Sequence, residues 1–223
     1  FTFEPTTDPV VKKLITELHI SSGPGISGIP TKLIKALPDK FISILTQLFN
    51  TCIKTCYIPN EWKCAVVTPL YKRKGKIDDI NNYRGISVLP PVAKIFERVL
   101  AMQITNYINN HKLFSSDQHG FRSFHSCETA LHEILSLINK IRMDRLIGLL
   151  LFIDFRKAFD LVDSLILLHK LSKYGFSDSA IKLLENYFHN RVQKTKYNGV
   201  FSKINDIKLG VPQGSVLGPL LFL

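Results

Sequence analysis

Apolar residues recur at helical spacing through residues 1–60. Thr7-Asp8-Pro9 is typical of a helix start, and a stretch rich in Gly, Pro and Ser from Ser21 to Pro30 predicts a loop. The residues that share one helical face before this loop are Val10, Val11, Leu14, Ile15 and Leu18. After the loop, a short helix carries Leu33, Ile34 and Leu37, and a second apolar stripe consists of Phe41, Ile44, Leu45, Leu48, Phe49 and Ile53.

Three later regions have the composition of β-strands. Cys64 to Tyr71 is apolar and rich in β-branched residues, which predicts a strand. Leu146 to Ile153 is a continuous apolar run without alternation, which predicts a strand covered on both faces. Val192–Tyr197 and Phe201–Leu209 flank Asn198-Gly199 and predict a hairpin.

Helical spacing returns between and after these strands. Pro90-Pro91 precedes a helix with an apolar face made of Val92, Ile95, Phe96, Val99, Leu100 and Ile104. Ser126 is a candidate N-cap for a helix that carries Leu131, Ile134, Leu135, Ile138 and Ile141. Two further helices are expected at residues 164–173 and 179–188. Helices and strands in this order predict an α+β fold.

Composition and charge narrow the class of protein. Hydrophobic residues make up 45% of the 223 residues and charged residues 21%, as in a globular protein. The longest apolar runs, such as Leu149 to Ile153, are too short to span a bilayer. The net charge of +11 favours a polyanionic partner such as nucleic acid, although a basic protein without such a partner has the same composition. Cys52, Cys56 and Cys64 have no evident fourth zinc ligand, so buried free thiols are expected.

The two ends of the sequence indicate a fragment of a longer reading frame. The first residues, Phe1 to Pro5, contain no initiator Met and lack the pattern of a signal peptide. The last residues, Gly218 to Leu223, stop inside an apolar run.

The strongest chemical signal follows the apolar run that ends at Ile153. The sequence Phe152 to Asp160 reads F-x-D-x-x-x-A-F-D, so an aspartate, Asp154, stands at the end of a predicted buried strand. A carboxylate on a rigid element suits phosphoryl transfer by two Mg²⁺ ions about 4 Å apart. The alternative is that Asp154 caps the next helix.

A second signal lies at Leu209 to Pro219, which contains G-x-P-Q-G-S-x-L-G-P. Gly210 and Gly214 allow close approach of a base or a sugar, and Gln213 offers both a donor and an acceptor. Ser215 is placed to cap a following helix. The alternative is an ordinary turn between a strand and a helix.

These two stretches resemble motifs A and B of reverse transcriptases, and the upstream sequence agrees. Trp62 with Pro69–Lys72, Asn82–Leu89 and Lys94–Arg98 resembles the first fingers motif of enzymes from non-LTR retrotransposons. Gln118–Ser123 with Ser126–Ala130 resembles the second fingers motif, and Gly25–Pro30 resembles the N-terminal motif of this group. The chain is identified as a partial member of the LINE/jockey-like non-LTR reverse transcriptases.

The resemblance implies a right-hand polymerase with fingers and a partial palm. The expected domains are a helical N-terminal extension at 1–60, fingers at 61–145 and a palm at 146–223 that stops before the family's Asp-Asp hairpin. The implied activity is RNA-directed DNA synthesis with an RNA template, a DNA primer and dNTPs. No membrane is implied, and target-primed synthesis implies an intracellular, nuclear site. The chain alone is expected to be inactive, because the hairpin completes the site for two Mg²⁺ ions.

The resemblance also assigns roles to single residues. Asp154 would be the first catalytic metal ligand, and the backbone carbonyl of Phe155 would meet a metal. Phe159 matches the aromatic steric gate that excludes ribonucleotides, and Asp160 would hold the following turn. Residues implied in contacting the nucleotide are Gln213, Gly214, Arg122, Arg84 and Lys72.

Each of these roles has a structural alternative. Phe159 could pack in the core, and the basic side chains could be solvated surface charges. The basic hairpin from Arg191 to Lys208 could follow the template–primer backbone or simply face water. The sequence departs from the family at Gly85, where Pro is usual, and at Ser27, where Asp is common; both changes are compatible with a decayed element.

Two rival functions remain on the sequence alone. One is another template-directed polymerase, such as a group II intron reverse transcriptase or an RNA-dependent RNA polymerase. Phe159 argues against a user of ribonucleotides, and the N-terminal loop with Ser126–Thr129 argues against the intron group. The other rival is a nucleic-acid-binding remnant without catalysis.

Overall fold

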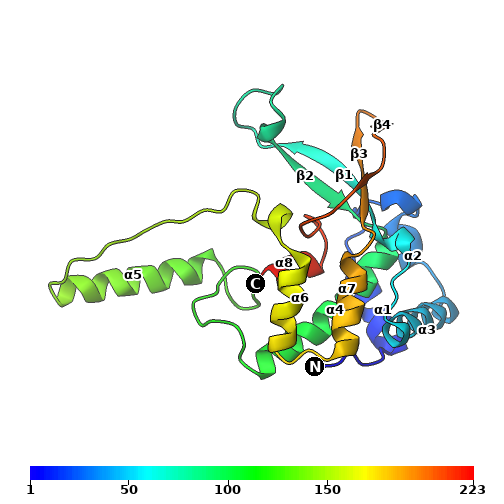
Figure 1. Cartoon of the computed structure of the whole chain (residues 1–223), viewed down its shortest axis with the longest axis horizontal. Helices are drawn as coiled ribbons and strands as arrows, with labels where there is room; N and C mark the ends of the chain where they lie inside the picture. The colour runs from blue at the N-terminus through cyan, green and yellow to red at the C-terminus, as the bar shows by residue number, and fades with distance from the viewer.

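A computed structural model describes all residues from 1 to 223 and shows helices together with one sheet (Figure 1). The helices gather in one body, the sheet stands at one edge of it, and helix α5 extends away from both as an arm (Figure 1). The predicted mixture of helices and strands is confirmed.

The helical body has one continuous core. Its helices are α1 (Asp8–Thr16), α2 (Thr31–Lys35), α3 (Asp39–Thr55), α4 (Pro91–Asn110), α6 (Ser164–Lys173), α7 (Asp178–Phe188) and α8 (Leu217–Phe222). A cluster of 26 buried residues runs through these helices, from Phe3 to Leu221. At its centre Phe49 and Trp62 both pack against Phe96, with ring centroids 5.3 and 5.6 Å from that ring. The N-terminal helices therefore share their core with α4 and α7.

Local signals in the sequence set several helix boundaries. Thr7 is the N-cap residue of α1 and Pro9 stands in the first turn, as predicted. The apolar stripe of α3 is only partly buried, because Ile44 and Leu48 are exposed whereas Leu45 and Phe49 lie in the core. The stripe is therefore wider than the face that packs.

The sheet has the strand order β2-β1-β3-β4, and β5 pairs with β3. Its strands are β1 (Cys64–Tyr71), β2 (Tyr83–Val88), β3 (Val192–Tyr197), β4 (Val200–Phe201) and β5 (Asn205–Asp206). Strand β1 runs antiparallel to β2 and parallel to β3. The predicted hairpin is confirmed, with Asn198 and Gly199 at φ angles of 47° and 82°. Its second strand is not continuous over 201–209 as predicted, but broken into the short β4 and β5.

The arm contains α5 (Cys127–Met143) and the segment that returns from it (Figure 1). The predicted N-cap is confirmed: Ser126 accepts hydrogen bonds from the amides of Glu128 and Thr129 in a capping box. None of the residues of α5 is buried.

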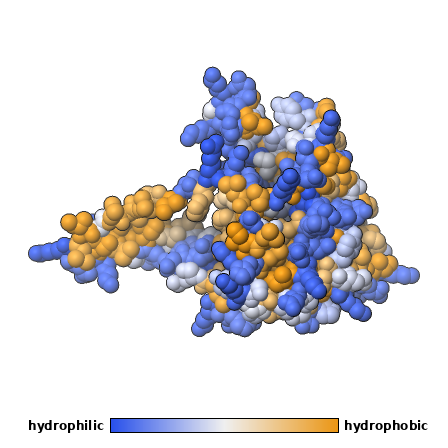
Figure 2. Space-filling model, in the orientation of Figure 1, coloured by the Kyte–Doolittle hydropathy of each residue, from blue (hydrophilic) through white to orange (hydrophobic).

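The predicted buried strand at 146–153 is wrong. This segment has no regular secondary structure, and Ile147 and Leu149 are almost fully exposed. A strand requires hydrogen bonds to a neighbour, and none of the five strands pairs with this segment. The apolar residues of the arm instead form part of the surface (Figure 2).

No helix of the structure combines the length and the apolar character required to cross a bilayer.

Candidate nucleotide site

The loop from Ile207 to Val216, which leads into α8, docks on the 3₁₀ turn Ala158–Leu161. The amide of Gly210 donates to the carbonyl of Val162 at 2.8 Å, and the amide of Val211 donates to the carbonyl of Phe159 at 2.8 Å. Gly210 has a φ of +90°, and a Cβ there would lie 2.8 Å from the backbone of Asp160. Only glycine allows this approach.

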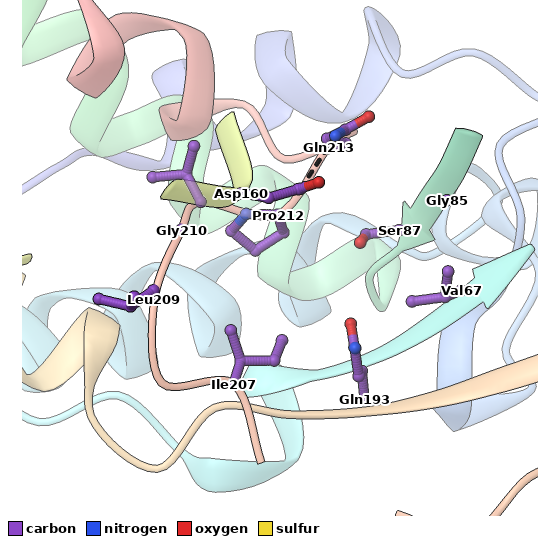
Figure 3. A pocket seen from close by; sticks show the side chains of 11 residues that line it. Val67, Gly85, Ser87, Asp160, Gln193, Ile207, Leu209, Gly210, Pro212 and Gln213 are labelled. Carbon is purple, nitrogen blue, oxygen red and sulfur yellow. Dashed lines mark hydrogen bonds between the residues drawn. The ribbon is translucent and has the colours of Figure 1, made fainter. Parts of the chain in front are cut away.

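Gln213 is held by two bonds. Its side-chain Nε2 donates to Oδ1 of Asp160 at 2.9 Å, and its carbonyl accepts from the amide of Ser87 at 2.7 Å (Figure 3). The next residue, Gly214, has a φ of +117°, and a Cβ there would lie 2.6 Å from the carbonyl oxygen of Ser87. The structure thus brings together the two stretches singled out in the sequence, and Asp160 links them directly.

A cavity of about 250 Å³ opens beside Gln213 (Figure 3). Its floor is one face of the sheet. Val67 pairs with Ser87, and Gly85 and Gln193 lie on the same face because side chains alternate along each strand. Gly85 contributes no side chain to this floor. The lining residues are Val67, Gly85, Ser87, Asp160, Gln193, Ile207, Leu209, Gly210, Val211, Pro212 and Gln213.

Phe159 is half-buried in a small aromatic cluster. Its ring centroid lies 5.0 Å from that of Phe222 in α8 and 5.9 Å, edge to face, from that of Phe121. The sequence reasoning missed Phe121 as a neighbour of Phe159, although it stands directly before Arg122 in the second fingers motif. Phe159 does not line the cavity beside Gln213, but it is adjacent to Asp160, which does.

Asp154 stands apart from the cavity. It is exposed and follows the irregular segment, so the expected rigid strand does not hold it. The next α-helix is α6, and its N-cap is Asp163, which accepts from the amides of Leu165 and Ile166. Asp154 therefore does not have the alternative capping role. Phe155 is also exposed. No group of three or more His, Cys, Asp or Glu side chains is placed to hold a metal ion, so the donors of this chain do not by themselves fit the two-metal site.

Comparison with known proteins decides the family, because residues 71–223 match the family described as reverse transcriptase (RNA-dependent DNA polymerase). The chain belongs to the reverse transcriptase family. It is 31% identical over 220 residues to a probable RNA-directed DNA polymerase from transposon X-element of Drosophila melanogaster, covering 99% of this chain and 24% of that protein.

Two further relatives match parts of the chain of different length. The chain is 31% identical over 212 residues to the RNA-directed DNA polymerase from mobile element jockey of the same species, covering 95% of this chain and 23% of the relative. A putative COX1/OXI3 intron 1 protein of Saccharomyces cerevisiae is 30% identical over 142 residues, covering 62% of this chain and 15% of that protein. The chain spans about a quarter of the length of the first two relatives. The predicted relation to non-LTR retrotransposon reverse transcriptases is confirmed.

The three basic residues implied in contacting the nucleotide, Arg122, Arg84 and Lys72, do not line the cavity. Arg122 donates through Nη1 to the carbonyl of Ser115 at 2.8 Å and thus holds its own loop. Lys72 donates through Nζ to the carbonyl of Asn81 at 2.7 Å and closes the β1–β2 connection. Arg84 is exposed, and it alternates with Gly85, so its side chain lies on the sheet face opposite the cavity.

Behind the Gln213 turn lies a buried polar cluster that the sequence reasoning missed. Glu97 of α4 is 3% exposed and accepts from the hydroxyl of Tyr187 at 3.1 Å. Burial raises the pKa of the Glu97 carboxyl, while Arg191 and the amides of Val216 and Leu217 act to lower it. Burial also disfavours the charged form of Lys63: desolvation, together with repulsion from Arg191, lowers the pKa of this lysine. The available signal was a glutamate at helical spacing with the apolar residues Ala93, Leu100 and Ile104 of α4.

Proposed function

We propose that the chain is the nucleotide-binding part of an RNA-directed DNA polymerase from a non-LTR retrotransposon. The observation that carries the proposal is the hydrogen bond between Gln213 and Asp160 at the edge of the cavity. It joins the two motifs that the family uses around the incoming nucleotide. In this proposal, Gln213 and Gly214 contact a dNTP, and Phe159 excludes the 2′-hydroxyl of a ribonucleotide.

The proposed domain arrangement is a helical extension at 1–60, fingers at 61–145 and a palm at 146–223. Strands β1 and β2 with their connection, and the loop of Arg122, would belong to the fingers, whereas β3, β4 and β5 of the same sheet would belong to the palm. Arg84, Arg122 and Lys72 would reach the triphosphate only after rearrangement, because two of them are engaged elsewhere and the third faces away.

The proposed role of Asp154, with the carbonyl of Phe155, is to ligate Mg²⁺ together with carboxylates that this chain does not supply. The support is the family match and the position of Asp154 just before the Phe159–Asp160 pair. The isolated chain is therefore expected to lack polymerase activity. Synthesis primed at a chromosomal target would take place in the nucleus.

The test is primer extension on poly(rA)/oligo(dT) with Mg²⁺, using the protein extended beyond Leu223. We expect activity that Asp154→Asn abolishes, because a neutral amide is a much poorer ligand for a hard cation. Asp117→Asn, an exposed change of the same kind, is the matched control and should remain active. An active Asp154→Asn protein would refute the role of Asp154.

A second candidate is nucleic-acid binding without catalysis, which the net charge of +11 favours. This reading predicts an extended protein that binds template–primer but does not extend it. A group II intron type of reverse transcriptase is a third interpretation, and the yeast relative named as an intron protein matches this chain at lower coverage.

A further inference from the structure

The Gln213 turn is anchored from behind by a residue outside both motifs. Oε2 of Glu97 accepts from the backbone amide of Val216 at 2.6 Å and from that of Leu217 at 3.3 Å. We propose that Glu97 is a positioning residue of the nucleotide site, which fixes the Gln213 turn through these two amides. This inference rests on the proposed function for its consequence, but not for its geometry.

Glu97 supplies an acceptor for the two amides at the start of α8 that the local sequence leaves without one. Val216, at the N-cap position, makes no side-chain hydrogen bond to cap the helix. The first amides of a helix have no partner within it and require an acceptor when they are buried. Glu97 serves Val216 and Leu217, and Oγ of Ser215 serves Gly218 at 3.0 Å, which confirms the capping role expected for Ser215.

Glu97 and the buried guanidinium of Arg191 both contact Tyr187. The guanidinium of Arg191 is 2% exposed and lies over the ring of Tyr187 at 4.5 Å, while Nη1 donates to the carbonyl of Tyr187. Nε and Nη2 of Arg191 have no hydrogen-bond partner. Burial raises the pKa of the Glu97 carboxyl, and attraction to Arg191 opposes that shift. A buried cation such as Arg191 depends on an anion in its surroundings. A neutral residue at 97 would leave Arg191 uncompensated.

Three contacts therefore determine where Gln213 sits. Asp160 holds its side chain, Ser87 holds its carbonyl, and Glu97 holds the chain directly after Ser215. The first two contacts are made near the cavity, whereas Glu97 is buried within the helical body. Without Glu97 the turn keeps its contacts to Asp160 and Ser87, but loses the fixed point that orients it against α4 and α7.

The first test is amide hydrogen exchange on the full chain carrying Glu97→Gln. Glutamine keeps the shape of the side chain but removes the charge, and a charged acceptor holds backbone amides more strongly than a neutral one. We expect exchange at Val216 and Leu217 to accelerate by about tenfold or more. Amide exchange rates in α1 and α3 should stay within about twofold of those in the unchanged protein, because these helices are distant from the substitution. The matched control is Glu185→Gln in α7, an exposed position.

The second test measures nucleotide use by the extended polymerase. Glu97→Gln should raise KM for dNTP by about tenfold while kcat and the affinity for template–primer stay within about twofold, because uniform binding is lost and no reacting group is touched. A purely structural role would lower kcat and the active fraction instead. Unchanged exchange at Val216 and Leu217 or an unchanged KM would overturn the inference.

Two outcomes separate this inference from the proposed function. If the extended protein with the natural sequence shows no primer extension, the proposed function fails, while the exchange result still decides whether Glu97 positions the turn. If Glu97→Gln does not fold, the double variant Glu97→Gln/Arg191→Met removes both buried charges and should restore folding. Exchange at Val216 that remains slow in the refolded double variant would equally overturn the inference.

Discussion

At the scale of single residues, close backbone contacts define the site more than charges do. Gly210 and Gly214 let the loop before α8 approach the backbones of Asp160 and Ser87. The sequence predicted close approach at these glycines, although it assigned that approach to a nucleotide. The structure shows that protein backbone already occupies the space next to both.

Gly214→Ala should therefore be costly. The new Cβ would lie 2.6 Å from a backbone oxygen at a φ of +117°, so the turn must shift away from Ser87. We expect a loss of about 3 kcal/mol in the free energy of unfolding, measured by urea denaturation. Gly28→Ala is the control, because its φ of +68° is also positive but nothing lies within 4 Å of the new Cβ. That variant should lose only about 1 kcal/mol, and equal losses would show that the contact with Ser87 is unimportant.

Residue-level prediction from the sequence succeeded where the signal was local. Gln213 and Asp160 were singled out from short motifs, and the structure joins them by a hydrogen bond. Glu97 falls within Lys94–Arg98 of the first fingers motif, but no role was assigned to it, because its partners Tyr187 and Val216 are remote in sequence and no local pattern reveals them. The buried state of Arg191 was missed for the same reason.

At the scale of elements, α5 shows what a helix needs when it has no tertiary support. None of its residues is buried, so its stability depends on its own sequence and on its cap. The bounds of α6 and α7 were predicted to within one residue, since periodicity is a local property. The strand predicted at 146–153 needed a neighbour, and a sequence pattern cannot supply one.

Ser126→Ala should destabilise α5 without affecting the core. The substitution removes the acceptor for the amides of Glu128 and Thr129, which costs about 1 kcal/mol of helix stability. Exchange of amides in the first turns of α5 should accelerate about fivefold, whereas amides of α4 should not change. Ser136→Ala in the middle of α5 provides the control. Equal acceleration in both variants would argue against the cap.

At the scale of the whole molecule, the net charge of +11 is compatible with a nucleic-acid partner. The hairpin region from Arg191 to Lys208 was predicted as a possible path for the template–primer backbone. Arg191 is buried and cannot serve this purpose, which leaves four lysines on the region. Those lysines are Lys194, Lys196, Lys203 and Lys208.

Replacing these four lysines with glutamine tests the path directly. Each phosphate contact that is lost should reduce the slope of log affinity against log salt by about 0.9 for duplex and about 0.7 for single strands. We therefore expect a drop of about 3 in the slope for template–primer, with weaker binding at low salt, measured by fluorescence anisotropy across a salt series. The control replaces four exposed lysines on or between the N-terminal helices, namely Lys13, Lys32, Lys40 and Lys54.

Both variants carry the same net charge, so the comparison separates position from total charge. A control that lowers the slope as much as the hairpin variant would show that binding follows overall charge and has no defined path. A larger effect of the hairpin variant would place the nucleic acid along β3, β4 and β5. Lys194 and Lys196 alternate with Gln193 along β3, so the nucleic acid would contact the sheet face opposite the Gln213 cavity, the face on which Arg84 also lies.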